Sequence, residues 1–463
     1  MTAPAVADRT VGRRSDRTPA WQVTLAFVVL ATLYAAISIQ QYRRMDSYVF
    51  DLGFFESVIR DYAHGHLPHV PVTDTTSAAL HFSPALALLA PVVLVWPSPV
   101  AVLTSQAVLV AIGVVPLMRA AVRGWMAWAV AVSYGLAPGV SALIGFDFHE
   151  VAFAVPLLAF SMAAMVRGHH RSAVLWALPL ILVKEDLGLT VAALGLVVFL
   201  RGSRRLGTFA MAFGAVAFAV LALWLPHARG SGGFAEGVAP HSLADAWHNL
   251  GEGWHNKGRT VLFLLLPTGL LALRSPMLLL VALPTYAWRF ISARYTYWDP
   301  WYQYDVVLVP IAVAAMIEGA VLLHGRVRQL GLVAAVAGTL ALLPQQYLAF
   351  KQVWDPDFWH TPARTAAVDR VLERIPDGSR VAASDDLGGR IALRTDLYIV
   401  GDTIGADGPP SPPSDFDEVE WIALDTEIAP APVPAWRGFA ALIQSGEFEV
   451  VAQADGVVVA RRK

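Results

Sequence analysis

Residues 173–200 read A-V-L-W-A-L-P-L-I-L-V-K-E-D-L-G-L-T-V-A-A-L-G-L-V-V-F-L, and three charges, Lys184, Glu185 and Asp186, interrupt this apolar stretch. About 20 apolar residues suffice for a helix to span a bilayer. One charged side chain at mid-membrane costs about 2.5–3.5 kcal/mol on insertion scales, and three facing lipid would cost roughly three times as much. We therefore expect them to face a protein-lined cavity, to pair with each other, or to reach the outer surface on a helical hairpin.

The apolar character extends from Trp21 to Phe350, and an ordinary soluble composition begins after Trp354. The 463 residues are 56% hydrophobic and 15% charged, with a mean hydropathy of +0.53. A soluble chain has about 25% charged residues. Twelve segments are candidate membrane helices: Trp21–Gln40, Ala79–Trp96, Pro99–Met118, Trp125–Phe146, Val151–Val166, Ala173–Val183, Leu187–Leu200, Leu206–Leu225, Thr260–Leu273, Pro276–Phe290, Tyr304–Leu323 and Leu330–Leu343. The sequence thus predicts an all-α polytopic transmembrane bundle over residues 21–350.

Arginine placement predicts the orientation of this bundle in the cell membrane. Basic residues favour cytoplasmic loops, and they occur in the N-terminal tail of residues 1–20 and in alternate loops. These arginines are Arg9, Arg13, Arg14, Arg17, Arg119, Arg123, Arg167, Arg171, Arg201, Arg204, Arg205, Arg274, Arg326 and Arg328. The remaining loops contain nearly all the acids of the membrane region. Segments 79–96 and 99–118 lie between an outer loop and an inner loop. A change of side requires an odd number of crossings, so one of these two segments is expected to be re-entrant or interfacial. About eleven crossings then place the N-terminus in the cytoplasm and the C-terminus outside.

The C-terminal residues 351–463 predict a small soluble α/β domain, which this topology makes extracytoplasmic. Short β-like runs occur at Arg380–Ala383, Leu397–Val400 and Glu420–Leu424, and residues Ala435–Gln444 are typical of a helix. Glu449–Ala452 and Val457–Ala460 flank Asp455-Gly456, a sequence that favours a two-residue hairpin turn.

Composition and motifs exclude several classes of function. The chain has no cysteine, which rules out disulfides, thiolate metal sites and thiol catalysis. The formal net charge is −2, and no basic stripe suggests nucleic acid as a partner. A phosphate-binding loop and a dinucleotide fingerprint are both absent, so this chain is not expected to hydrolyse nucleotides.

Polar groups gather in loops that the topology places outside. Asp51 follows the first helix and opens an apparent amphipathic helix, where an ordinary N-cap role is the alternative. His81 lies at the outer mouth of the next segment, where an interfacial hydrogen bond is the simpler interpretation. Asp147 and His149 lie with Glu150 in a short loop, and a histidine beside carboxylates can act as a proton acceptor.

An aromatic stretch with two arginines completes this set. Arg289 and Arg294 precede Y-T-Y-W-D-P-W-Y-Q-Y at residues 295–304, which includes Tyr297 and Tyr302. Aromatic residues at a membrane interface usually form a belt, but this density exceeds a normal belt. Arginine binds phosphate with two hydrogen bonds, and aromatic faces pack well against sugar or prenyl groups.

With these residues in view, the chain resembles a family of prokaryotic polytopic proteins, domain of unknown function 2079. The resemblance rests on Phe50-Asp51-Leu52-Gly53, His81-Phe82-Ser83-Pro84, Asp147-Phe148-His149, Lys184-Glu185-Asp186 and the tyrosine-rich stretch ending in Tyr304. The family plan resembles that of the GT-C glycosyltransferases, which use polyprenyl-phosphate sugars on the outer face. A carboxylate in the first outer loop is catalytic in those enzymes, and Asp51 matches it by position. The paired acidic motif common in GT-C loops is absent, because leucine follows Asp51.

The leading hypothesis is a glycosyltransferase that moves a sugar from a polyprenyl-phosphate donor to an acceptor outside the cytoplasm. Asp51 would be the catalytic base, while Lys184, Arg289 or Arg294 would neutralise the phosphate. The expected sugar ligands are His81, Asp147, His149, Glu185, Asp186, Tyr297 and Tyr302. A divalent cation is compatible with Asp51, Asp147 and His149. The alternatives are a carrier of lipid-linked or polar solutes, for which no internal repeat is found, and a scaffold that presents the C-terminal domain.

Overall fold

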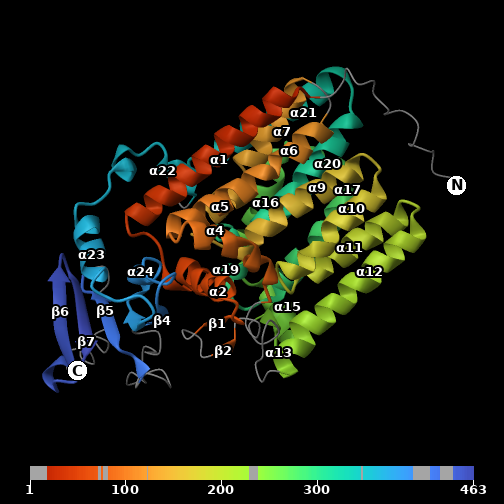
Figure 1. Ribbon diagram of the computed structural model, residues 1–463. Helices are drawn as coiled ribbons and strands as arrows, with labels where there is room; N and C mark the ends of the chain where they lie inside the picture. The colour runs from red at the N-terminus through yellow and green to blue at the C-terminus, as the bar shows by residue number, and fades with distance from the viewer. Residues whose placement is uncertain are drawn as a thin grey trace.

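Two parts make up the molecule, a bundle of helices and a C-terminal sheet at one end of it (Figure 1). The computed structural model describes residues 18–70, 75–76, 82–121, 124–228, 238–345, 348–399, 418–427 and 442–463. The last turn of α1 (Ala20–Arg43) points toward the sheet, and α2 (Phe54–Ala63), α13 (Leu225–Ala228) and α15 (Leu243–Gly251) lie at that same end of the bundle. We call it the site end.

The bundle consists of apolar helices, many of them broken into shorter pieces. Its further α-helices are α4 (Ala90–Val95), α5 (Pro99–Ile112), α6 (Val114–Ala120), α7 (Trp125–Gly135), α8 (Pro138–Gly145), α9 (Ala154–Val166), α10 (His170–Ala177), α11 (Leu187–Leu200), α12 (Arg204–Phe218), α16 (Trp254–Leu265), α17 (Pro276–Leu279), α18 (Leu283–Ile291), α19 (Tyr295–Trp298), α20 (Val309–Val321), α21 (Gly325–Leu342) and α22 (Ala349–Gln352). A mostly helical, apolar architecture is confirmed.

Four helical stretches within the described residues are long and apolar enough to cross a membrane: Ala20–Arg43, Pro99–Ala120, Arg204–Ala228 and Tyr295–Val321. The pair formed by α7 and α8 is a fifth if its 42° bend is part of one span. Shorter apolar helices coincide with several other expected segments. Pro84–Val95 is one of them, and its six 3-10 and six α-helical residues would rise only about 21 Å. This length favours a re-entrant or interfacial role for segment 79–96, while the expected eleven crossings stay a prediction.

Helices α11 and α12 form a close hairpin because glycines line their contact. A Cβ atom on Gly195 of α11 would lie 2.5 Å from the backbone nitrogen of Met211 in α12. A Cβ atom on Gly188 would lie 2.7 Å from the carbonyl oxygen of Gly214. Small residues let helix backbones approach closely in membranes. The hairpin therefore fixes the start of α11, directly after Lys184, Glu185 and Asp186.

The C-terminal part is a five-stranded mixed sheet with the strand order β4-β3-β5-β7-β6. The strands are β3 (Arg380–Ala383), β4 (Asp396–Ile399), β5 (Trp421–Asp425), β6 (Phe448–Ala454) and β7 (Val457–Arg462), preceded by helix α23 (Arg364–Leu372). β3 pairs in parallel with β4 and β5, and β7 pairs antiparallel with β5 and β6. The three expected strands and the hairpin are confirmed. Residues 435–441 of the expected helix lie outside the described residues.

The sheet is docked onto the segment between α1 and α2. Met45 and Val49 belong to the same buried cluster as Val381 of β3 and Leu387 of the short helix α24 (Asp385–Gly388). Arg60 of α2 donates to carbonyl groups of the sheet part and forms a 2.8 Å ion pair with Asp396. The first loop of the chain therefore completes the core of its last structural unit.

Candidate functional site

Asp51 lies in a single π-helical turn, Val49–Gly53, and α2 begins only at Phe54. The sequence suggested that Asp51 opens the helix, with an N-cap as the simpler role, but no side-chain cap hydrogen bond is present at the start of α2. The apolar side of this amphipathic helix, which includes Phe55, Val58 and Ile59, is buried. Asp51 keeps 25% of its side chain exposed, so its carboxylate is available for another task.

Two carboxylates from distant parts of the chain hold the segment before Asp51. Asp147 accepts hydrogen bonds from the Ser47 hydroxyl at 2.6 Å and from the Tyr48 backbone at 2.9 Å. Asp385 of α24 accepts from the Val49 backbone at 2.9 Å. Burial raises the pKa of Asp147 to about 7, against the lowering effect of the hydrogen bonds from Ser47 and Tyr48. The bundle and the sheet thus position this loop together.

His149 faces Asp51 directly, with 3.2 Å between Nε2 and the carboxylate Oδ1. The other ring nitrogen, Nδ1, lies 2.9 Å from the Phe146 carbonyl, and the Gln303 amide lies 2.9 Å from Nε2. The His149 backbone donates to Gln106 Oε1 at 2.8 Å. Burial lowers the pKa of His149, but the hydrogen bond to Asp51 and the charges of Asp51 and Glu150 outweigh it and raise the pKa overall. Asp51 and His149 can therefore share a proton.

Lys184, Glu185 and Asp186 each contact a protein group from another segment, and a cavity at these three residues stays a prediction. Lys184 Nζ lies 2.5 Å from Glu150 Oε1, and the Glu150 side chain is only 1% exposed. Glu185 accepts from the Phe82 backbone at 3.3 Å, and Asp186 accepts from the Trp288 indole at 3.1 Å. These contacts join the break before α11 to the loop of His149 and to α18.

Arg289 is fully buried and ion-paired with Asp305 at 2.5 Å. Its Nε donates to the Tyr297 carbonyl at 2.5 Å, while Nη2 has no hydrogen-bond partner among the described residues. Arg294 is exposed, and its guanidinium carbon lies 6.0 Å from the Tyr297 ring centre. The Tyr302 ring lies 5.1 Å from that of Phe146, three residues before His149. The aromatic stretch therefore reaches both arginines and the loop of His149.

A family model described as a predicted membrane protein family, DUF2079, matches residues 41–459. The chain belongs to the DUF2079 family. The match includes the segments of Asp51, Asp147, Lys184 and Arg289. A comparison with curated proteins gives no match.

Solved structures of ArnT from Cupriavidus metallidurans share the fold of this DUF2079 protein. The structure bound to undecaprenyl phosphate has a TM-score of 0.53 at 16% identity and covers 96% of this chain and 98% of ArnT. The apo structure has a TM-score of 0.52 at 15% identity, with 95% and 98% coverage. The expected resemblance to GT-C glycosyltransferases is thereby confirmed for the fold.

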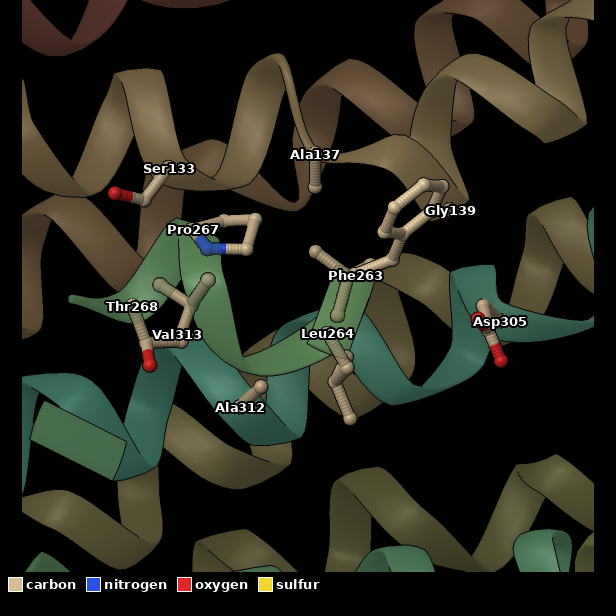
Figure 2. Close-up of a pocket in the computed structure, with 11 residues that line it drawn as sticks. Ser133, Ala137, Gly139, Phe263, Leu264, Pro267, Thr268, Asp305, Ala312 and Val313 are labelled. Carbon is tan, nitrogen blue, oxygen red and sulfur yellow. The ribbon is translucent and has the colours of Figure 1, made fainter. Parts of the chain in front are cut away.

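The open spaces of the DUF2079 protein differ in size and place. A buried cavity of about 10 Å³ has Ser133 and Thr268 at one end and Asp305 at the other (Figure 2), and this volume suits a single water molecule. A groove of about 500 Å³ between α4 and α5 is lined mainly by apolar side chains, including Phe153, which follows Glu150 by three residues. Of these two spaces within the described residues, the groove is the one large enough for a lipid chain.

The remaining expectations concern a metal ion and His81. Among the described residues, no group of three or more histidines and carboxylates could hold a metal ion. Of the three candidates, Asp147 directs its carboxylate to Ser47 and Tyr48 instead of joining Asp51 and His149. His81 lies outside the described residues.

The sequence analysis did not single out several polar side chains that lie at or near the candidate site. Gln106 and Gln303 orient His149, while Glu56 of α2 is fully buried, without hydrogen-bond partners for its carboxylate oxygens within the described segments. Burial raises the pKa of Glu56 far above the ordinary value, and the charge of Asp147 raises it further. A lone glutamine within the apolar segment 99–118 was the signal that could have identified Gln106.

Proposed function

We propose that the protein is a GT-C-like glycosyltransferase that moves a sugar from a polyprenyl-phosphate donor to an acceptor hydroxyl on the extracytoplasmic side. The observation that carries this proposal is the contact between Asp51 and His149 at the site end of an ArnT-like fold. Polar groups from four distant loops converge there. The fold alone would leave the activity open.

Asp51 acts as the general base in this proposal. The acceptor oxygen attacks the anomeric carbon while Asp51 takes its proton, and the bond from that carbon to the phosphate oxygen breaks. The polyprenyl phosphate leaves with the bonding electrons, so the anomeric configuration inverts. His149 accepts a share of the proton from Asp51, and Gln303 holds the imidazole in place. General-base catalysis typically contributes 10²- to 10⁴-fold to the rate.

Cations near the aromatic stretch bind the phosphate. Arg289 is fully buried, its Nη2 has no hydrogen-bond partner among the described residues, and an arginine can contact phosphate with more than one donor. Arg294 is exposed, lies 6.0 Å from the Tyr297 ring centre and can attract the donor from the membrane surface. Lys184 adds positive charge but is held by Glu150. Such groups stabilise the negative charge that develops on the leaving phosphate.

The sugar and the lipid tail occupy different parts of the site. Glu185, Asp186, Tyr297 and Tyr302, together with His81 and Asp147, supply hydrogen bonds and aromatic faces for the sugar. The apolar groove between α4 and α5 is suited to the prenyl chain. No step of this proposal requires a metal ion.

The proposal also includes the topology. The N-terminal residues 1–20 are cytoplasmic, residues 21–350 span the cell membrane about eleven times, and residues 351–463 form an extracytoplasmic domain. The docking of the sheet onto Met45 and Val49 supports this placement, because the first loop and the C-terminal part must then lie on the same side. A C-terminal alkaline phosphatase fusion should be active. A fluorescent C-terminal fusion of the folding-sensitive type would contradict the topology.

The catalytic proposal is tested with Asp51→Asn and a control in the same loop. Asp46→Asn is the control, because Asp46 is 54% exposed and pairs with Arg44 at the surface. Purified proteins in nanodiscs are supplied with undecaprenyl-phosphate sugars and assayed for transfer to acceptor or water. Wild type and Asp46→Asn should transfer the sugar, whereas Asp51→Asn should bind undecaprenyl phosphate normally and lose 10²- to 10⁴-fold in rate. Wild-type transfer by a folded Asp51→Asn protein would remove Asp51 from the mechanism.

A further inference from the structure

An exposed apolar stripe runs along helix α15 at the site end. Leu243, Trp247 and Leu250 follow a spacing of four and three residues, which places them on one face of a helix. Leu243 is 91% exposed and Trp247 is 79% exposed. We group Trp254, the first residue of α16, with this stripe because its large apolar side chain is also exposed, at 64%. Soluble surfaces rarely leave such a continuous set of large apolar side chains in water.

The other two faces of α15 have different surroundings. Asp245 and His248 are exposed and polar, and at 100° per residue they lie about 100–160° around the helix from the stripe residues. Asn249 is buried, and its amide donates to the Ile291 carbonyl at the end of α18 at 2.9 Å. The helix therefore has one protein face, one polar face and one apolar face, the arrangement of a helix that lies flat in a membrane surface.

The neighbouring elements place α15 at the depth of that surface. The span Arg204–Ala228 has 25 residues and rises about 37 Å, which exceeds a hydrocarbon core of about 30 Å. Trp224, near its end, is 63% exposed. Helix α16 then returns into the bundle from Trp254. In Figure 1, α13 and α15 lie at the same end of the bundle, and tryptophans are enriched where such spans leave the lipid.

A buried lysine makes the connection of α15 to the bundle rigid. Lys257 donates to the carbonyls of Asn249 and Phe290, and its ammonium lies 4.8 Å from the Trp298 ring centre. Phe290 follows Arg289 directly. The position of α15 is thus coupled to the segment that carries Arg289 and begins the aromatic stretch.

We propose that α15 is an interfacial helix that buries the stripe of Leu243, Trp247, Leu250 and Trp254 in the outer leaflet of the bilayer. The bilayer fits this surface better than a protein partner, because α15 lies at the same end of the bundle as α13, the last turn of the span Arg204–Ala228 (Figure 1). The helix anchors the Arg289 segment at the level of the lipid headgroups. This last consequence and the assignment to the outer leaflet rest on the proposed function, whereas the membrane contact itself does not.

The absence of cysteine from the chain permits a direct test. Single variants Leu243→Cys, Trp247→Cys and Asp245→Cys are labelled with a nitroxide, and the full-length protein is reconstituted into nanodiscs. Collision with oxygen, which dissolves in lipid, is compared with collision with a water-soluble nickel chelate. Labels at 243 and 247 should collide with oxygen severalfold more often than with the nickel chelate. The label at 245 should collide more often with the nickel chelate.

Two outcomes would overturn the proposal. If the labels at 243 and 247 collide with the nickel chelate as often as the label at 245 does, the stripe lies in water. If they show dipolar broadening, the stripe faces a second copy of the chain. The measurement needs no transfer activity, so its failure is distinguishable from failure of the proposed function. Leu243→Cys removes a side chain that is almost fully exposed and therefore provides a variant that keeps the fold.

Discussion

Replacing Lys184 with methionine should strongly destabilise the bundle. The ammonium lies 2.5 Å from Glu150, and the charges of Glu185 and Asp186 also act on it. Lys184→Met keeps a similar chain length but removes the cation that pairs with Glu150 and lies near Glu185 and Asp186. Breaking one partner of a buried pair costs about 3–5 kcal/mol. Glu150→Gln should cost less, about 1–3 kcal/mol, because the amide still accepts a hydrogen bond from the lysine.

The loss in free energy of unfolding corresponds to a measurable change in the midpoint of thermal unfolding. An unfolding entropy of about 2.1 cal/mol/K per residue over 463 residues amounts to about 1 kcal/mol/K. Lys184→Met should therefore lower the midpoint by roughly 3–5 °C, or by more if helices remain in the bilayer after unfolding. The 15 tryptophans allow the transition to be followed by intrinsic fluorescence in nanodiscs.

A control comes from the ion pair between Arg461 and Glu449 in the sheet. Its nitrogen-to-oxygen distance is 2.6 Å, but the two side chains are 54% and 42% exposed. Such exposed pairs contribute about 0–1 kcal/mol, so Arg461→Met should barely move the midpoint. Equal shifts for Lys184→Met and Arg461→Met would refute the inference that the charges before α11 are buried in protein. A double variant, Lys184→Met with Glu150→Leu, should recover part of the loss.

Three further results are expected. Burial raises the pKa of Asp386 from 3.8 to about 8, so the folded state binds a proton that the unfolded chain releases, and stability should fall between about pH 4 and pH 8. Asp386→Asn should make this slope shallower in thermal scans, and an unchanged slope would exclude Asp386 as a contributor to it. Gly195→Leu would place Cβ 2.5 Å from a backbone nitrogen of α12 and should abolish the stable hairpin, whereas Gly258→Leu, with no atom within 4 Å, should preserve folded yield. Asp385→Ala removes the hydrogen bond from the Val49 backbone and should lower kcat roughly tenfold, as expected for small misplacements of a catalytic group, with little change in lipid binding. An equal loss of binding would instead indicate general disruption.

The sequence predicted the parts of the fold that depend on local patterns. Apolar length identified the bundle, and the Asp455-Gly456 turn identified the last hairpin, where the residues have φ values of 42° and 80°. Proline indicated some of the helix breaks, but the sequence did not predict the others, because these depend on contacts between distant segments. Gly269, for example, has a φ of 57° and a Cβ there would lie within 3 Å of the backbone of α21. The sequence alone does not show that α21 passes there.

The sequence predicted which charged residues belong to the candidate site but not which of them form ion pairs with each other. The cost of placing charges in lipid showed that Lys184, Glu185 and Asp186 needed polar surroundings. The partner of Lys184 is Glu150, 34 residues away, and the partner of Arg289 is Asp305. Pairing depends on tertiary distance, so a sequence that offers several acids in each outer loop does not specify it.

The shared core of the first loop and the last sheet has a consequence for biosynthesis. Val49 leaves the ribosome 336 residues before Asp385, its hydrogen-bond partner. At 5–20 residues per second, this interval lasts roughly 20–70 s. During that time the loop of Asp51 lacks the structural unit that completes its packing. A nascent or truncated chain would therefore be inserted in the membrane with an unfinished site, so that only complete translation yields an active protein.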